Sequence, residues 1–193
     1  RSHHARVIRN LAAMNVYAQI VDFIFKDKVD AVEDQALIRA AAGAENVYFG
    51  MSFASLPGPF ASDTTVTGPE AIGYLDATKW SLKVDGDPEN FISGAAPDIT
   101  YPALSSVSKG LGFINLGPDS DGILRRVPLL VRYRDAFYPS LAFRVACDFL
   151  DVSPDQIIVR PGKAVILKEA RTGAPEWTTD IVIPTDEAGN MLV

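Results

Sequence analysis

The chain has 193 residues, of which 48% are hydrophobic and 22% are charged, and its 18 basic and 24 acidic side chains give a formal net charge of −6. This is the composition of a globular domain and not of a disordered chain, and we expect residues 1–193 to form a single domain. Phosphate binding needs a clustered positive face, so the acidic balance argues against nucleic acid as a partner. Cys147 is the single cysteine, so no disulfide can form within the chain.

The first part of the sequence alternates between helix and strand patterns. Apolar residues at helical spacing predict a helix over about residues 3–14. Residues 16–25 are nearly continuously apolar and predict a strand covered on both faces, as in a parallel sheet. A capping box at 30–33 predicts the start of a second helix, which we expect to end at Gly43. Residues 47–51 predict the next buried strand, and the succession indicates a right-handed β-α-β crossover.

Residues 55–100 are the least patterned part of the chain. Proline and glycine interrupt them repeatedly, and a short strand is predicted within residues 79–84. The weak pattern predicts a loop-rich insertion here. So long a loop-rich stretch is either functional or mobile.

The second half begins with short elements. Residues 101–108 predict a short helix with a proline in its first turn. Residues 112–116 predict a strand. A longer strand at 123–133 is expected to pair with residues 136–138 through a turn at 134–135.

The remaining residues predict one helix and further strands. Pro139 is expected to open a helix that reaches about Leu150 and is deeply buried, because it is apolar nearly all round. A hairpin is predicted at 157–168 and a last strand at 181–184. The fold class that follows is α/β, with a mixed central sheet, flanking helices, an opening β-α-β unit and antiparallel hairpins in the second half.

Asp22 is the first candidate functional residue. It lies late in a predicted buried strand, and ligands in open α/β sheets bind at the carboxyl ends of strands. A carboxylate there could hold a metal, a phosphorylated side chain or a polar ligand. The alternative, which we favour, is a carboxylate that orders the following loop by accepting backbone N–H groups.

Asn115, Asp119 and Asp121 form a second group of candidates. Oxygen ligands at alternating positions before Gly122 match part of a calcium-binding loop. The glutamate that completes such a loop is missing, and two arginines follow instead. A plain turn is therefore the favoured interpretation.

Arg125 and Arg126 are the last candidates. Neighbouring residues of a strand point to opposite faces, so we expect one arginine to face inward, where it must be paired. It could bind an anionic ligand, or it could clamp Asp22, Asp119 or Asp121. We favour the clamp.

The chain carries none of the common catalytic motifs. No serine lies in a Gly-x-Ser-x-Gly elbow, no Gly-x-Gly-x-x-Gly opens a helix, and no cysteine and histidine spacing suits a metal. We therefore expect no catalytic residue, no metal site and no cofactor.

A series of motifs in the second half resembles one known family. The motifs are Gly-Phe-x-Asn at 112–115, Asp-x-Asp-Gly at 119–122, Arg-Arg-x-Pro-Leu at 125–129 and Pro-Ser-Leu-Ala at 139–142. Their combination resembles the type-two CHASE family, the cyclases/histidine kinases associated sensory extracellular domains. Residues 21–25 and 183–189 are similar to an early strand and a late turn of the family. The resemblance thus covers nearly the whole chain and leaves only 55–100 unmatched.

The resemblance implies a sensory domain outside the bacterial cytoplasmic membrane, periplasmic or extracellular. One membrane helix would precede the domain, and usually several would follow it. The output would be a cytoplasmic nucleotide cyclase, histidine kinase or serine/threonine kinase, and a homodimer is implied because such outputs work in pairs. We expect the sequence to be a piece of such a receptor.

The resemblance does not identify a ligand. The family's ligands are not generally known, so the partner could be a small molecule or an extracytoplasmic protein. Asp22, Asn115, Asp121, Arg125 and Arg126 are candidate ligand-binding residues by position alone.

Two other functions stay open at this point. One is a small-molecule hydrolase in which Asp22 converges with Asp119 and Asp121, which requires a shared pocket. The other is a scaffold that binds an extracytoplasmic protein, which requires an exposed apolar patch.

Overall fold

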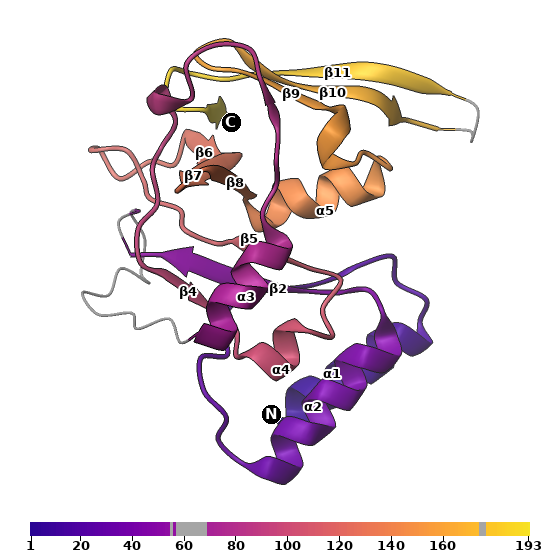
Figure 1. The fold of residues 1–193 in the computed structure, drawn as a ribbon. Coiled ribbons are helices and arrows are strands. Elements are labelled where there is room, and N and C mark those ends of the chain that lie inside the picture. The colour runs from indigo at the N-terminus through magenta and orange to yellow at the C-terminus, as the bar shows by residue number, and fades with distance from the viewer. Residues whose placement is uncertain (55, 57–68, 174–176) are drawn as a thin grey trace.

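The computed structural model describes residues 1–54, 56, 69–173 and 177–193 (Figure 1). Its helices are α1 (Ser2–Ala13), α2 (Ala31–Ala44), α3 (Pro69–Thr78), α4 (Pro102–Ser105) and α5 (Leu141–Phe149), with 3₁₀ turns at Pro88–Asn90 and Pro154–Gln156. Its strands are β1 (Gln19–Val21), β2 (Val47–Phe53), β3 (Lys83–Val84), β4 (Pro97–Ile99), β5 (Gly110–Phe113), β6 (Arg126–Pro128), β7 (Leu130–Tyr133), β8 (Ala136–Pro139), β9 (Ile157–Arg160), β10 (Ala164–Arg171), β11 (Thr178–Pro184) and β12 (Asn190–Leu192).

A mixed sheet around β2 lies at the centre of the molecule. Strands β1 and β5 pair with β2 in parallel, and β4 pairs with its last residues in antiparallel orientation. Helices α1, α2 and α4 lie on one side of this sheet, whereas α5 lies on the other side, beneath a second sheet of order β11-β10-β9-β3 (Figure 1). The prediction of an α/β fold with a mixed central sheet, flanking helices and later antiparallel hairpins is confirmed.

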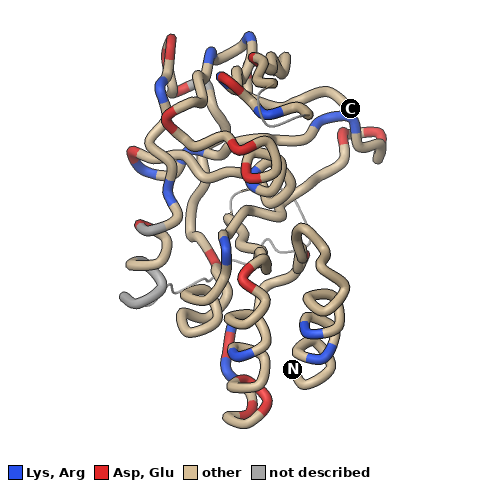
Figure 2. Tube along the Cα trace, turned by 90° about the vertical axis from the view of Figure 1, so that its right-hand side faces the viewer, with Lys and Arg blue, Asp and Glu red and all other residues tan. Residues whose placement is uncertain are grey.

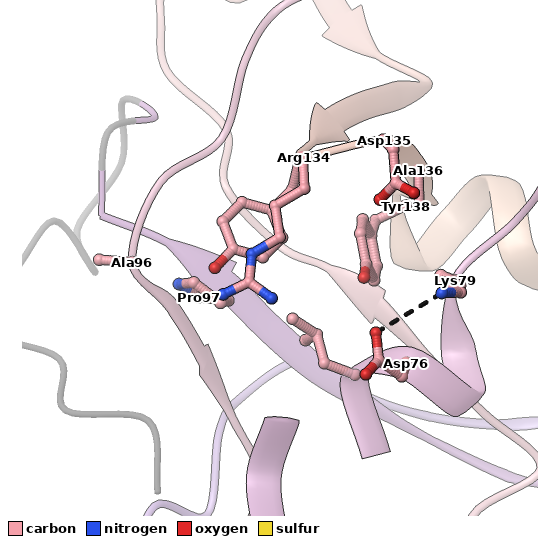
Figure 3. A pocket seen from close by; sticks show the side chains of 10 residues that line it. Asp76, Lys79, Ala96, Pro97, Arg134, Asp135, Ala136 and Tyr138 are labelled. Carbon is pink, nitrogen blue, oxygen red and sulfur yellow. Dashed lines mark ion pairs between the residues drawn. The ribbon is translucent and has the colours of Figure 1, made fainter. Parts of the chain in front are cut away.

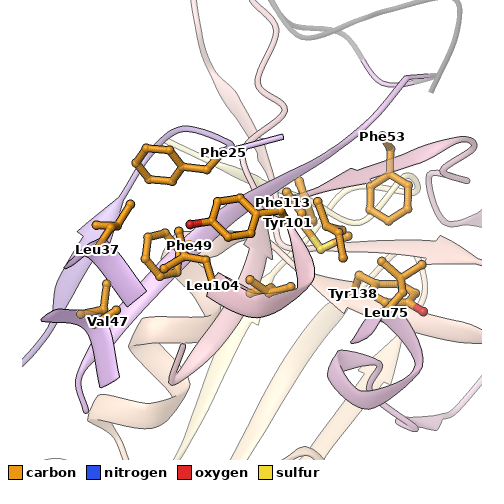
Figure 4. Close-up of a cluster of buried hydrophobic side chains, with 14 of the residues drawn as sticks. Phe25, Leu37, Val47, Phe49, Phe53, Leu75, Tyr101, Leu104, Phe113 and Tyr138 are labelled. Carbon is orange, nitrogen blue, oxygen red and sulfur yellow. The ribbon is translucent and has the colours of Figure 1, made fainter. Parts of the chain in front are cut away.

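The face of the central sheet that α1, α2 and α4 cover carries the main hydrophobic core. Val47, Phe49 and Phe53 alternate along β2 and point to this side, because every second residue of a strand shares a face. Leu37 of α2 and Leu104 of α4 belong to the same cluster, and all five side chains are fully buried (Figure 4). Burial of each such side chain stabilises the fold by about 1.5–3 kcal/mol.

The opposite face of the same strands carries glycines, which allow α5 to approach closely. Gly110 and Gly112 of β5 face α5, whereas a Cβ atom on Gly50 of β2 would meet Ile114 at 3.0 Å. A Cβ atom on Gly112 would lie 2.4 Å from the Cα of Leu141, so no larger residue fits there without moving α5. Ser140 caps this helix by accepting the backbone N–H of Phe143 at 3.3 Å.

The first strand is shorter and more exposed than the sequence indicates. Only Gln19–Val21 of residues 16–25 pair with β2, at the edge of the sheet. Ile20 is 53% exposed, and the ring of Phe23 lies in the following loop, 4.9 Å from the ring of Phe25. The prediction of a long strand covered on both faces is wrong, because the apolar residues after Val21 pack as a loop instead of extending the ladder.

Two acidic residues shape the start of α2. Asp30 Oδ1 accepts two backbone N–H groups of the first turn, each at 2.9 Å. The backbone N–H of Asp30 in turn bonds to Asp34 and not to Glu33, which the predicted capping box requires. Asp34 is 2% exposed, and its carboxylate lies 3.1 Å from Nε of Arg1 at the start of α1. This ion pair ties the first helix to the second.

Two helix boundaries differ from prediction. Gly43 lies inside α2, and the helix ends where Glu45 takes a left-handed conformation with φ 58°. Pro139 ends β8 and does not open α5, because Ser140 is the capping residue. The helix is also less buried than predicted, since Phe149 is 63% exposed.

The predicted strand at 123–133 is in fact two strands with different partners. Strand β6 pairs with β12, whereas β7 pairs with β8 through the turn at Arg134 and Asp135. Pro128 is the last residue of β6, and a proline has no backbone N–H to donate to a ladder. The change of partner therefore divides the stretch.

Part of the stretch 55–100 takes part in the sheets. Strand β4 extends the central sheet and β3 pairs in parallel with β9 of the second sheet. Trp80 exchanges backbone hydrogen bonds with Phe137 of β8, at 2.8 and 3.1 Å. The expected short strand within 79–84 is confirmed as β3. Residues 55 and 57–68 lie outside the described residues.

Cys147 lies where α5 packs against the second sheet. Its side chain is fully buried in a cluster with Ile157, Val159 and Val165, and burial raises the pKa of its thiol to about 12. Because only the thiolate reacts with disulfide reagents, we expect no reaction of the folded protein with Ellman's reagent at pH 8 and one equivalent in guanidinium. The variant Ala142→Cys, with its new thiol on the exposed side of α5, should react as folded protein. Fast reaction of the native wild type would contradict this packing.

Candidate functional site

Asp22 lies at the rim of an apolar groove. It follows β1, is exposed, and shares with Asn115 a groove of about 230 Å³ that is otherwise lined mainly by apolar residues of β5, β6 and α5. The groove lies at the carboxyl ends of the parallel strands β1 and β5, where a ligand crevice is expected. Asp22 makes no ion pair or hydrogen bond with another described residue. Its role as a ligand contact stays a prediction.

Asn115 lines this groove, but its side-chain amide is occupied by the backbone of Phe53. It is 3% exposed, and its side-chain amide makes two hydrogen bonds to the backbone of Phe53. Its Oδ1 accepts the N–H of Phe53 at 2.8 Å, and its Nδ2 donates to the carbonyl of Phe53 at 3.0 Å. The amide thereby continues the pairing of β2 with β5 by one step beyond Phe113, and it has little capacity left for a ligand.

Arg125 and Arg126 are both tied to nearby carboxylates. Arg125 lies 3.4 Å from Asp119 and 2.8 Å from Asp121, and Arg126 lies 3.1 Å from Asp119 and 3.7 Å from Asp186. The pairs link the turn at 119–122 and β6 to the turn before β12. Asp22 is not among the partners of either arginine.

These ion pairs lie at the surface. Arg125 is 47% exposed and Arg126 is 55% exposed, so the prediction that one of them faces inward is wrong. The stretch before β6 is not a regular strand, and strand alternation therefore does not apply to Arg125. Such exposed pairs are screened by solvent and contribute little to stability. Basic and acidic residues are also interspersed elsewhere along the described chain (Figure 2).

The aspartates proposed for a hydrolase do not share a pocket. Neither Asp119 nor Asp121 lines the groove beside Asp22. The Arg125 side chain lowers the pKa of Asp121, whereas a general acid at neutral pH needs a raised pKa. The described residues also contain no group of three histidine, cysteine or acidic side chains placed to hold a metal.

A second cavity, which we call the hairpin pocket, lies where α3 meets β4 and the β7–β8 hairpin. Its volume is about 220 Å³ (Figure 3). It is lined by Leu75, Asp76, Lys79, Ala96, Pro97, Tyr133, Arg134, Asp135, Ala136 and Tyr138. Unlike the groove beside Asp22, this pocket offers charged groups of both signs.

Tyr138 presents its hydroxyl to the hairpin pocket. The residue is 2% exposed and its hydroxyl points into the cavity (Figure 3). This hydroxyl makes no hydrogen bond to another described residue, and its oxygen is not fully enclosed by the protein. Burial raises the pKa of the phenol to about 12, and the carboxylate of Asp76 adds to the shift. The arrangement suits a ligand that supplies the missing hydrogen bond.

Sequence reasoning did not identify the hairpin pocket. Asp76 and Lys79 belong to the weakly patterned stretch 55–100. For Arg134 and Asp135 the sequence predicts a turn and no binding role. One signal was present: Tyr138 lies two residues after Ala136 in the strand that follows the turn, so the two side chains share a strand face. The contribution of α3 depends on tertiary packing, which local sequence does not indicate.

Replacement of Asn115 should destabilise the fold strongly. Asn115→Ala leaves the buried N–H of Phe53 without a partner, whereas the Phe53 carbonyl still accepts the N–H of Leu56, and we expect a loss of about 1–3 kcal/mol in the free energy of unfolding. Urea denaturation followed by circular dichroism measures this loss. The control Asn10→Ala, at an exposed position of α1, should stay within about 0.5 kcal/mol of the wild type. Equal stability of both variants would show that the amide bonds do not matter.

Tyr138 should make the protein sensitive to alkali. The phenol ionises near pH 10 in the unfolded chain but only near pH 12 in the folded protein, so the unfolded chain loses its proton first as the pH rises. The free energy of unfolding contributed by this group is therefore complete below pH 10 and declines above it. We expect Tyr138→Phe to lose stability less steeply than the wild type between pH 10 and 12, in urea titrations at fixed pH. Parallel curves would refute the assignment.

Comparison with known proteins identifies the family. No described helix has the length and apolar character needed to cross a membrane. No curated protein and no solved structure matches the sequence. The family model of the CHASE2 domain matches residues 1–193, from the start of α1 to the end of β12. This chain therefore belongs to the CHASE2 domain family, the extracellular sensory domains of membrane receptors.

Proposed function

We propose that the chain is the extracytoplasmic sensor of a bacterial membrane receptor. In the full-length protein, membrane helices would flank it, and a cytoplasmic nucleotide cyclase, histidine kinase or serine/threonine kinase would carry the output. The observation that supports this proposal is the family match over residues 1–193. We also propose that the chain acts as a single domain and as a homodimer, because the outputs that the resemblance implies work in pairs.

The hairpin pocket is the proposed place of ligand binding. A ligand changes signalling only if it binds one arrangement of the domain better than another. The Tyr138 ring lies 5.7 Å from the ring of Phe53, whose backbone is held by Asn115. Strand β8 continues through the capping residue Ser140 into α5. A ligand that repositions Tyr138 would therefore act on the end of β2 and on the start of α5.

The two other functions have less support. A hydrolase would need the three aspartates in one pocket, which the lining of the groove beside Asp22 does not provide. A protein-binding scaffold requires an exposed apolar patch, which could lie in the stretch 55–100, and residues 55 and 57–68 of that stretch lie outside the described residues. Neither alternative accounts for a pocket that presents the Tyr138 hydroxyl beside charged groups of both signs.

A topology experiment tests the proposed location. Alkaline phosphatase folds to an active enzyme only outside the cytoplasm, where its disulfides form. We expect the phosphatase to be active when it is inserted in the full-length protein between Gly162 and Lys163, in the exposed turn of the β9–β10 hairpin. Phosphatase activity per amount of fusion protein in intact cells is the measurement.

A matched control uses the same insertion in a protein that lacks the segment before residue 1. This control should be inactive, because the membrane helix proposed to export the domain has been removed. A stable full-length fusion without phosphatase activity would overturn the proposed location.

A further inference from the structure

The charged residues of the hairpin pocket balance one another. Asp76 and Asp135 supply two negative charges, and Lys79 and Arg134 supply two positive ones, so these four side chains sum to zero. A pocket of this kind does not favour a ligand with a net charge of either sign. It favours a ligand that carries both signs at separate positions.

The positive and negative groups lie on different sides of the pocket. The Arg134 guanidinium lies on one side, over the ring of Tyr133 at 5.0 Å, and forms no ion pair with a described carboxylate (Figure 3). Asp76 lies on the other side and is 3.6 Å from Lys79. Both partners of that pair are more than one third exposed, so the pair is weak and another cation can replace Lys79.

The space between these two sides suits a small molecule. The hydroxyl of Tyr138 points into it, without a partner among the described residues (Figure 3). Leu75 and Ala136 add apolar surface to the wall. The volume of about 220 Å³ lies below the ~300–1,000 Å³ of pockets for drug-sized ligands. Peptides and nucleotides are therefore too large to be enclosed.

We propose that the hairpin pocket binds a small zwitterion of the α-amino acid type, whose carboxylate pairs with Arg134 and whose ammonium group pairs with Asp76. The Tyr138 hydroxyl bonds to the ligand between these two contacts, and an aliphatic side chain packs against Leu75. This inference rests on the proposed sensory function and specifies the ligand of the same site.

Calorimetry with matched ligands tests the charge requirement. The probes are glycine, L-alanine, L-serine and L-valine, together with isovalerate, which is valine without its ammonium group, and isobutylamine, which is valine without its carboxylate. We expect one site per chain for L-valine and at least tenfold weaker binding of both single-charge analogues. The inference is overturned if none of the four amino acids binds, or if either analogue binds as tightly as L-valine.

Two variants test the assignment of each charge. Arg134→Gln should weaken L-valine binding at least tenfold and leave isobutylamine unchanged, because that ligand has no carboxylate. Asp76→Asn should also weaken L-valine binding at least tenfold, and it should leave isovalerate binding unchanged, because that ligand has no ammonium group. Arg160→Gln removes an exposed arginine from β9, outside the pocket, and serves as the matched control with unaltered affinity. Equal losses in all three variants would contradict the assignment.

The fold of each variant is checked by the protection of Cys147 from Ellman's reagent. The two proposals fail separately. An active phosphatase insertion with no binding of any amino acid leaves the sensor outside the membrane and refutes the ligand class. An inactive insertion refutes the location even if L-valine binds.

Discussion

The hydrogen bonds between the Asn115 amide and the backbone of Phe53 hold together the part of the molecule on which the rest depends. At this point β2 and β5 end, and the N–H of Phe53 would otherwise lack a partner, whereas its carbonyl also accepts the N–H of Leu56. The Phe53 ring contacts the rings of Phe113, Tyr133 and Tyr138. One side-chain amide thus fixes both the end of the central sheet and the back of the hairpin pocket.

The motifs that identify the family contribute mainly to the fold. Gly112 permits α5 to touch β5, Ser140 caps α5, and Asn115 closes the sheet. The arginines at 125 and 126 join the turn at 119–122 to the turn before β12. Such residues are specific because each meets a geometric demand: a missing Cβ, a helix cap, or an amide that pairs with a backbone.

The sequence predicted elements well where one local rule decides and poorly where packing decides. Apolar periodicity located α1, and turn residues located the β9–β10 hairpin, because both signals are contained in adjacent residues. The length of β1 depends on how many residues β2 can pair with, which residues 16–25 do not reveal. Arg125 and Arg126 follow a turn, so strand alternation gave them the wrong orientation.

The hairpin pocket could not be predicted from the sequence either, because packing between distant segments forms it. Its walls come from α3, β4 and the β7–β8 hairpin, which are distant in the chain and meet only when β4 pairs with β2. Asp76 and Lys79 also belong to the stretch that the family motifs leave unmatched. The charged groups facing a ligand are thus partly separate from the residues that build the fold. A change at Asp76 can alter ligand choice without disturbing the contacts of Gly112, Asn115 and Ser140. The family motifs therefore identify the scaffold of the sensor, whereas the charged residues that we propose as ligand contacts, Asp76 and Arg134, lie outside those motifs.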